Sequence, residues 1–398
     1  MLQLLHLLLG ATSRRWQHKG ANVNFRDELE SWPAERVKAC IDAASPDDVE
    51  RALSREERTP RDLCALLSPH GAERMEPIAR EAQRLTRWHF GRTIGMYVPL
   101  YISNVCGADC TYCGYAVRSG NKEKRRTLTH DEIRAECEAL VAQGFQSVLL
   151  LTGEARRAVP PSYIGEAVSI AREYFASVAV EVYTLDQSDY EDYVRRGLDG
   201  VTIYMETYDR TMYADVHLIG EKADYDYRLD AIERAGRAGV RRLSVGALLG
   251  LTDWRVDGFW AALHARHVQK ACWQSAVSVS FPRLRHVPER FHIPELVTDK
   301  QLVQLILALR LFLPEVGFNL STRETAGFRD KLIPLGVTMM SAGSSTRPGG
   351  YSLYGEETLE QFEIEDRRTA PEVAAAITRA GYEPVWKDYD HAFDSTVQ

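Results

Sequence analysis

The sequence predicts an α/β protein whose core is a (β/α)8 TIM-type barrel, with a helical lead-in before it and a helical tail after it. Three observations support this fold class. Eight apolar, β-branched runs lie between residues 96 and 343. Helical patterns separate most of them, and the runs are nearly continuous, as in strands buried on both faces. Eight such units over about 250 residues match a closed barrel; a doubly wound open sheet is the alternative.

Composition sets the outer limits. The 398-residue chain is 45% hydrophobic, with 49 basic and 56 acidic side chains and a formal charge of −7. It can bury a large core, and its mild acidity does not favour general nucleic-acid binding. No apolar run of about 18 residues predicts a membrane span. Seven cysteines, four of them scattered, argue against a disulfide framework and favour a reducing, cytoplasmic compartment.

The chain before the barrel divides into two predicted parts. Residues 1–23 form an N-terminal extension that could be disordered: "MLQLLHLLLGATSRRW" has the apolar length of a signal peptide, but no basic residue precedes it. Residues 24–95 form the helical lead-in. Ser45 is a candidate N-cap followed by acidic residues, Thr59-Pro60 opens a second helix, and "GAERMEPIAREAQRLTRWHFG" is typical of a third, amphipathic helix.

The barrel is predicted over residues 96–351 and the tail over 352–398. The expected strands are residues 96–102, 146–152, 178–184, 200–206, 241–249, 276–282, 317–322 and 337–343. The capping box "THDE" at 129–132 opens one helix, and Gly239 ends another. In the tail, "TAPEVAAAITRAGY" predicts a helix packed on the outside.

Polar residues follow most of the predicted strands, at the end where barrel enzymes carry their chemistry. They are Cys106 to Cys113, Thr152 to Glu154, Glu206 to Tyr208, Asp253, Arg283, Arg323 with Glu324, and Ser341 to Ser345. Any one of them could be an ordinary loop residue. Together they favour an active site at this end of the barrel.

The cysteine motif lies in "YVPLYISNVCGADCTYCGY", where Cys106, Cys110 and Cys113 have the spacing C-x3-C-x2-C. A structural zinc site needs four ligands, and the next histidine, His130, belongs to another element. Soft thiolates suit iron–sulfur clusters. We predict a [4Fe–4S] cluster with one iron left open for a chelating cofactor. Zinc and chemically idle cysteines are the less favoured alternatives.

This spacing, with Tyr112 before the last cysteine, resembles the signature of the radical S-adenosylmethionine (SAM) superfamily. Further motifs resemble its aromatic amino acid lyases, in particular the ThiH-type tyrosine lyases (2-iminoacetate synthases) of thiamin biosynthesis. They are "YVPLY", "LLLTGE", "YMETYD", "GALLGLTDWRVD", "SVSFPRLR", "LSTRE", "STRPGGY" and "PVWKDYD". The resemblance extends from about residue 24 to residue 390.

The resemblance implies a reaction. The open iron binds SAM, and an electron from the cluster cleaves SAM to methionine and a 5′-deoxyadenosyl radical. The radical takes hydrogen from the amine of L-tyrosine, and the Cα–Cβ bond breaks to give 2-iminoacetate and p-cresol. Two partners are implied: thiazole synthase, and a reducing electron donor such as flavodoxin or ferredoxin. Because fragmentation must outrun quenching, we expect a dry pocket.

The resemblance also assigns cofactor-binding residues. Glu154 would accept a hydrogen bond from the SAM ammonium, and Glu206 would meet the ribose or the methionine end. Tyr112 would pack near the adenine, and the backbone at Gly246 and Gly250 would approach it. The family usually has glutamine where Met205 stands, which puts the neighbouring polar contacts in doubt.

For the substrate, Arg323 is the expected partner of the carboxylate, because a guanidinium can hold it bidentately. A salt bridge from Arg323 to Glu324 or to a neighbouring residue is the alternative. Three further residues are candidates for binding the substrate amine: Tyr101, Ser341 and Ser344. Arg283 is expected to complete the polar wall, with a purely structural role as its alternative.

Three other functions are alternatives to a ThiH-type tyrosine lyase. Hydrogenase-maturation lyases of the family carry a second cluster on C-terminal cysteines, but no cysteine follows Cys272. A tryptophan lyase shares the arginine and tyrosine pattern and stays open. A non-catalytic iron–sulfur or zinc module would not need the charged residues at the strand ends.

Overall fold

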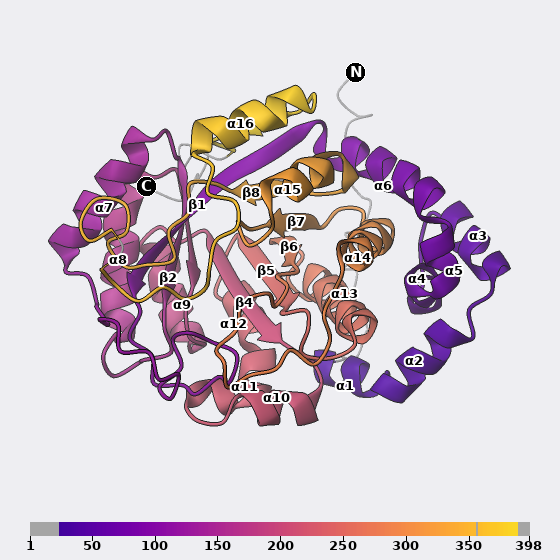
Figure 1. Ribbon diagram of the computed structural model, residues 1–398, viewed down its shortest axis with the longest axis horizontal. Coiled ribbons are helices and arrows are strands. Elements are labelled where there is room, and N and C mark those ends of the chain that lie inside the picture. The colour runs from indigo at the N-terminus through magenta and orange to yellow at the C-terminus, as the bar shows by residue number, and fades with distance from the viewer. Residues whose placement is uncertain (1–23, 356, 389–398) are drawn as a thin grey trace, which may run out of the picture.

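The barrel is closed. The computed structural model describes residues 24–355 and 357–388, so the predicted extension 1–23 and the last residues of "PVWKDYD" lie outside the described chain. Eight parallel strands run in the order β2 to β8 and then β1, and pairing of β1 with β2 closes the ring (Figure 1). The strands are β1 (Thr93–Ser103), β2 (Ser147–Thr152), β3 (Ser177–Glu181), β4 (Gly200–Glu206), β5 (Arg242–Ala247), β6 (Ala276–Ser280), β7 (Gly317–Leu320) and β8 (Met339–Ser341). The predicted fold class is confirmed, and the open sheet is wrong.

Helices cover the outside of the ring. They are α7 (His130–Ala142), α8 (Pro161–Tyr174), α9 (Gln187–Arg195), α10 (Arg210–Val216), α11 (Tyr225–Leu229), α12 (Ala231–Arg237), α13 (Trp254–Ala271), α14 (Asp299–Phe312) and α15 (Ala326–Leu332), with 3-10 turns η1 (Glu221–Ala223) and η2 (Ile333–Leu335). Thr129 and Glu132 form the predicted capping box of α7. No helix in the described ranges combines the length and hydrophobicity needed to span a bilayer.

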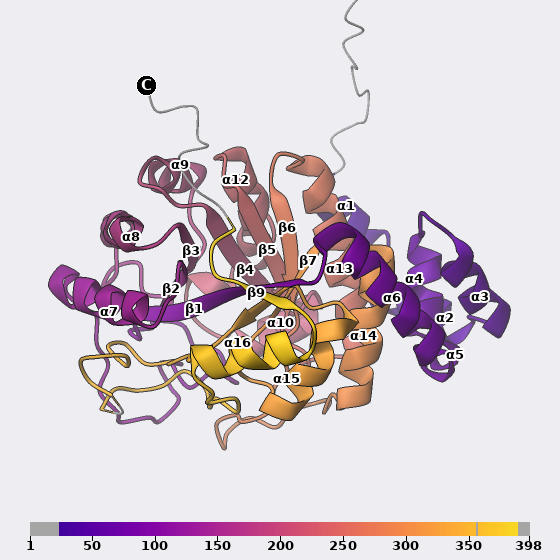
Figure 2. The same ribbon diagram turned by 90° about the horizontal axis from the view of Figure 1, so that it is seen from above.

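The lead-in packs on one side of the barrel, against α13 and α14 (Figures 1 and 2). It comprises α1 (Phe25–Glu30), α2 (Ala34–Asp42), α3 (Pro46–Ser54), α4 (Pro60–Leu67), α5 (Pro69–Glu73) and α6 (Met75–Phe90). Ser45 and Thr59 cap α3 and α4 as expected. Polar anchors fix the contact: the Gln304 amide donates to the Leu66 and Ser68 carbonyls at 3.0 and 2.9 Å.

The tail contains the expected helix, α16 (Ala370–Arg379), and a strand that was not expected, β9 (Glu383–Val385). β9 pairs in parallel with the start of β1, with Thr93 opposite Glu383. Before α16 the chain crosses the strand-end side of the barrel as a covering segment (residues 357–368). The Leu359 amide donates to the Lys124 carbonyl at 3.2 Å, so this segment lies beside the loop that follows the cysteines (Figures 1 and 2).

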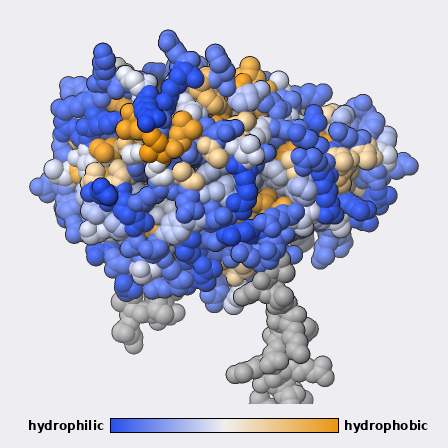
Figure 3. Space-filling model, turned by 90° about the horizontal axis from the view of Figure 1, so that it is seen from below, coloured by the Kyte–Doolittle hydropathy of each residue, from blue (hydrophilic) through white to orange (hydrophobic). Residues whose placement is uncertain are grey.

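The surface is largely hydrophilic on the face shown in Figure 3, where hydrophobic residues gather in small areas. Exposed apolar side chains also occur beside the cysteine motif: Val117, Leu218 and Ile219 are 53%, 50% and 38% exposed. The Leu218 amide donates to the Asp109 carbonyl, and the Asp109 amide to the Ile219 carbonyl, both at 3.1 Å. The outer side of the cysteine loop is therefore partly apolar.

Candidate active site

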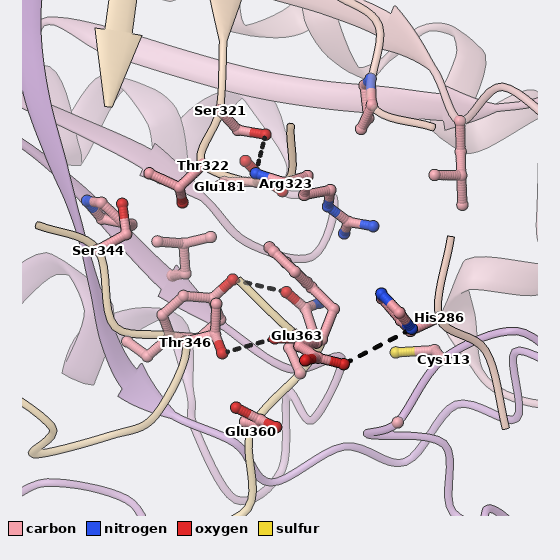
Figure 4. A pocket seen from close by; sticks show the side chains of 18 of the residues that line it. Cys113, Glu181, His286, Ser321, Thr322, Arg323, Ser344, Thr346, Glu360 and Glu363 are labelled. Carbon is pink, nitrogen blue, oxygen red and sulfur yellow. Dashed lines mark hydrogen bonds and ion pairs between the residues drawn. The ribbon is translucent and has the colours of Figure 1, made fainter. Parts of the chain in front are cut away.

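A cavity of about 380 Å³ opens at the carboxyl ends of the strands, in the size range of small-molecule sites. Its wall includes residues from six barrel strands, β1, β2, β3, β4, β6 and β8, and from the covering segment. Cys113 and Arg323 face it from different elements (Figure 4). The predicted location of the site, at the carboxyl end of the barrel, agrees with this geometry.

The cysteine loop is fixed by its backbone. The Gly107 amide donates to the Glu154 carbonyl at 2.7 Å, which ties the loop to the end of β2. Cys110 forms an antiparallel bridge with His217. The Arg290 guanidinium donates to the Asp109 carboxylate at 2.9 Å. These hydrogen bonds thus fix the loop that carries the three cysteines.

The three thiols influence one another. Burial, and then repulsion from Cys113, raises the pKa of Cys106 to about 11. Burial also raises the pKa of Cys110 and of Cys113. Such thiols stay protonated without a cation, and a coordinating metal removes the proton outright. A soft cationic group is therefore the ligand that this buried set of sulfur donors fits.

No three His, Cys, Asp or Glu side chains in the described ranges converge on a point where a single ion could sit. A zinc site takes four ligands on one ion, one more than the three cysteines of the loop provide. An iron–sulfur cluster is larger than one ion and takes each thiolate on a different iron. The donor set fits a cluster held by Cys106, Cys110 and Cys113 with one iron left without a cysteine.

Glu154 lies just after β2 with one oxygen occupied and one free. The Arg228 guanidinium binds its Oε1 at 3.1 Å, while its Oε2 is buried and without a hydrogen-bond partner in the described chain. Leaving a buried carboxylate oxygen unsatisfied is costly. A donor from a ligand would satisfy it, and the ammonium of SAM is a donor of the right charge.

Glu206 ends β4 in an unusual conformation. It is the one non-glycine residue with positive φ, 66°, in the described ranges, and such residues gather at functional sites. The Lys222 ammonium binds its carboxylate at 2.7 Å. Burial would raise the pKa of Glu206, but Lys222 and then Arg228 hold it below its ordinary value. Glu206 is thus an ionised, pre-positioned acceptor that faces the cavity.

Tyr112 lines the cavity, and its hydroxyl is 2.8 Å from the His217 Nε2. Burial lowers the pKa of His217 to about 3, so the ring is neutral. Its Nδ1 lies 2.9 Å from the Tyr213 carbonyl, which can only accept. The proton is therefore on Nδ1, Nε2 accepts from Tyr112, and the Tyr112 ring is held in one orientation.

Arg323 has its guanidinium carbon 3.4 Å from the centre of the Phe362 ring. In the described ranges it has no ion-pair partner. The alternative salt bridge to Glu324 is wrong, because Glu324 instead binds Arg283 and Arg285. A planar cation stacked on an aromatic ring keeps its donor edge available for a carboxylate.

The amine candidates share the same cavity wall. The Tyr101 hydroxyl donates to the Gln361 Oε1 at 2.6 Å. The Ser341 hydroxyl bonds to Tyr97. The Ser344 hydroxyl is buried and has no partner in the described chain, so it is available to a ligand. Ser344 and Arg323 appear together in Figure 4.

Arg283 is placed differently from the expectation. Its guanidinium lies outside the cavity wall and donates to Glu324 (Oε1) and Asp299, both at 2.8 Å. The Val297 carbonyl takes a third bond, also at 2.8 Å. Arg283 is thus a fully satisfied buried ion-pair residue. The run "SFPRLR" placed it after a strand but could not show which way it points.

Gly246 and Gly250 also lie outside the cavity wall, while Leu248 between them lines it. A Cβ on Gly246 would meet the Ser280 carbonyl at 2.3 Å and the Tyr204 ring at 2.8 Å. The glycine therefore makes room for Tyr204. Gly250 has φ of 116°, which disfavours any side chain there. Their approach to an adenine stays a prediction.

Several residues in or beside the cavity wall were not predicted from the sequence. Glu181 was visible as a charge inside the apolar run "VAVEVYT", a signal that could have been used. Lys222 and Arg228 lie in a polar stretch with nothing to single them out. Gln361 and Phe362 reach the site only because the covering segment folds back over the barrel.

Comparison with known proteins gives a consistent result. The Radical SAM superfamily model matches residues 100–264, and the Biotin and Thiamin Synthesis associated domain model matches 280–383. The 2-iminoacetate synthase of Salmonella typhimurium strain LT2 is 45% identical over 367 residues, covering 92% of this chain and 97% of that protein. The Escherichia coli K12 2-iminoacetate synthase is 44% identical over the same shares.

Solved structures agree on the fold. A crystal structure of HydG, a maturase of the [FeFe]-hydrogenase, has a TM-score of 0.83 at 29% identity, covering 91% of this chain and 84% of that one. Methylornithine synthase (PylB) has a TM-score of 0.68 at 21% identity, covering 85% and 97%. The second likeness concerns the fold alone.

Proposed function

The chain belongs to the 2-iminoacetate synthase family of radical SAM enzymes, and from that premise we propose how its pocket cleaves the Cα–Cβ bond of L-tyrosine to 2-iminoacetate and p-cresol. It is a carbon–carbon lyase of thiamin biosynthesis. The observation that supports the proposed pocket best is the single cavity shared by Cys113, Glu206 and Arg323.

The enzyme uses a [4Fe–4S] cluster and SAM. Cys106, Cys110 and Cys113 would hold the cluster, and Glu154 and Glu206 would hold SAM. When bound, the two groups supply the 5′-deoxyadenosyl radical that removes hydrogen from the substrate. The protein contributes fixed acceptors: the free oxygen of Glu154 for an ammonium, and the ionised carboxylate of Glu206 for hydroxyl groups.

Arg323 binds the substrate carboxylate in this proposal. Its stacking on Phe362 fixes the plane of the guanidinium, so little side-chain freedom remains to be lost on binding. Tyr101, Ser341 and Ser344 then face the amine, and Ser344 brings an unused hydroxyl. The aromatic side chain of the substrate would occupy the remaining, more apolar part of the cavity.

Water exclusion is the second contribution of the protein. Apolar side chains of β2 (Leu149 and Leu151), of the loop after β5 (Leu248) and of the covering segment (Leu359 and Phe362) line the cavity. The covering segment is anchored across the mouth, where His286 lies 2.9 Å from Glu365. We expect these apolar side chains to limit the access of water to a radical.

The product needs a receiver, because 2-iminoacetate hydrolyses to glyoxylate and ammonia. We propose thiazole synthase as the partner that receives it, and a reducing donor such as flavodoxin or ferredoxin as the source of electrons. A cytoplasmic location fits both partners and the need for reduced cysteines.

The decisive experiment is anaerobic. The reconstituted protein is given SAM and dithionite, with tyrosine and tryptophan in separate reactions, and 5′-deoxyadenosine, p-cresol and indole products are measured. We expect p-cresol from tyrosine alone. Cys110→Ala should abolish cluster and turnover together. Deoxyadenosine without p-cresol would retain the radical chemistry but move the substrate elsewhere, and indole products would support the tryptophan alternative.

A further inference from the structure

Glu181 is a charged residue at the end of β3 with no assigned role. It is the last residue of the strand, paired with Leu151 of β2, and its side chain faces the cavity (Figure 4). In the described ranges the structure shows no hydrogen bond or ion pair to its carboxylate. A carboxylate kept for structural reasons would be bonded to the scaffold, so this one is available to a ligand.

The charges around Glu181 are already matched, except for one. The titratable groups that face it are Tyr97, Tyr101, Tyr204, Glu206, Lys222, Arg228 and Arg323. Glu206 binds Lys222, and Arg228 binds Glu154. Arg323 is left with the Phe362 ring alone. Glu181 and Arg323 are therefore an unpaired anion and an unpaired cation that interact across one cavity, too far apart to bond to each other.

An α-amino acid carries the complementary pair of charges on one carbon atom. We propose that Glu181 binds the amino group of the substrate, opposite Arg323, and takes one proton from it. The inference rests on the proposed function, in which hydrogen is removed from that amine. One proton moves from nitrogen to a carboxylate oxygen, no electrons are transferred, and the substrate is left with a neutral NH2 group.

The environment suits a proton acceptor. Burial, and then the negative charge of Glu206, raises the pKa of Glu181 to about 7, well above that of an ordinary glutamate, about 4.3. The smaller gap to the pKa of an amino group makes the proton transfer less costly. An ordinary, solvated glutamate would be too weak a base to hold the proton near neutral pH.

The test compares two ligands on the reconstituted enzyme with SAM and without reductant. The ligands are tyrosine and 3-(4-hydroxyphenyl)propanoate, which lacks only the amino group. We expect Glu181→Gln to weaken tyrosine binding at least tenfold while leaving the desamino analogue unchanged or tighter. Glu123→Gln, a glutamate on the exposed rim of the same cavity, is the matched control and should change neither.

A pH profile gives the second readout. In the parent enzyme, kcat/KM for tyrosine should rise with pH through about 7 as Glu181 ionises, and Glu181→Gln should lose that limb. Equal weakening of both ligands would overturn the proposal, since it would place Glu181 at the phenol. Unchanged tyrosine binding in Glu181→Gln would overturn it as well. If the parent protein bound no tyrosine, the proposed function itself would fail.

Discussion

At the scale of single residues, the carboxyl end of the barrel holds both satisfied and unsatisfied buried polar groups. The Arg283 guanidinium donates hydrogen bonds to Glu324 and Asp299, so Arg283 is a scaffold residue. By contrast, Glu154 Oε2 and the Ser344 hydroxyl have no hydrogen-bond partner in the described chain. Because a buried polar atom without a partner is costly, we expect ligands to supply the missing bonds to these two atoms.

Replacing Arg323 by lysine should impair tyrosine binding. Lysine keeps the charge but loses the bidentate geometry and the stacking on Phe362. The loss of about 1.5–3 kcal/mol typical of a charged hydrogen bond corresponds to a KM for tyrosine about 10 to 100 times higher. Steady-state p-cresol formation measures it, with SAM affinity as the internal control. An unchanged KM would remove Arg323 from the substrate site.

Replacing Lys222 by methionine should destabilise the fold in a pH-dependent way. Removing one partner of a buried pair costs about 3–5 kcal/mol. Since Lys222 helps to hold the pKa of Glu206 below its ordinary value, the pair stabilises the fold above about pH 4.3 and loses this effect as the pH falls through the folded-state pKa. The deficit should therefore be larger at pH 7 than at pH 3.

Denaturant unfolding at both values measures the deficit. Lys270→Met, an exposed lysine on α13, controls for the loss of a surface charge and should change stability little at either pH. A Lys222→Met deficit that is equal at the two pH values would show that the ammonium acts by packing and not by its charge.

At the scale of elements, the covering segment is what completes the pocket. It brings Phe362 onto Arg323 and Gln361 onto Tyr101. The backbone amide of Gln361 also donates to the Thr346 carbonyl at 3.3 Å, which ties the segment to the loop after β8. A barrel alone would leave both of the side chains proposed to bind the substrate open to water.

Shortening Phe362 to alanine should therefore uncouple the reaction. Water gains access to the pocket, and more SAM is consumed without cleavage of tyrosine. The ratio of 5′-deoxyadenosine to p-cresol should rise severalfold, with the cluster content unchanged. Glu357→Ala, an exposed position on the same segment, is the control. A constant ratio in Phe362→Ala would show that the segment does not seal the site.

The hydrophobic periodicity of the sequence predicted the positions of the strands well. It could not predict the parts of the site that are built from residues far apart in the sequence. The eight apolar runs each overlap a barrel strand, because a buried parallel strand must be apolar on both faces. Cys106, Cys110 and Cys113 could be predicted as a cluster-binding motif just as well, since their spacing is local. The role of Gln361 could not be predicted in this way. It contacts Tyr101, 260 residues away in the sequence, and no local pattern encodes such a contact. The three-residue strand β9 is too short to show a period.

At the scale of the whole molecule, one continuous core joins the lead-in, the barrel and α16. Buried polar bonds connect the parts: the Arg58 guanidinium donates to the Leu311 carbonyl at 3.1 Å. The lead-in packs against α13 and α14 (Figure 2), and the residues that line the cavity begin only at Tyr97. It therefore supports the barrel without entering the site.

Loading the cluster and SAM should stabilise the entire chain, because ligands that bind only the folded state add to its free energy of unfolding. Anaerobic thermal unfolding should show a Tm several degrees higher after reconstitution, and higher again with SAM. Cys110→Ala should lose both increments. Cys40→Ala, a half-buried thiol on the lead-in, should keep them. Increments retained in Cys110→Ala would contradict the assigned ligands.

The placement of β1 bears on how the protein matures. The same strand pairs with β8 on one side and, at its start, with β9, both of which lie near the opposite end of the chain. During synthesis, β1 and the cysteine loop leave the ribosome long before these neighbours exist. The ring closes only after translation is nearly complete, because contacts so distant in sequence form late. Until the C-terminal strands are made, the cysteine loop therefore lacks part of the barrel that surrounds it in the folded chain.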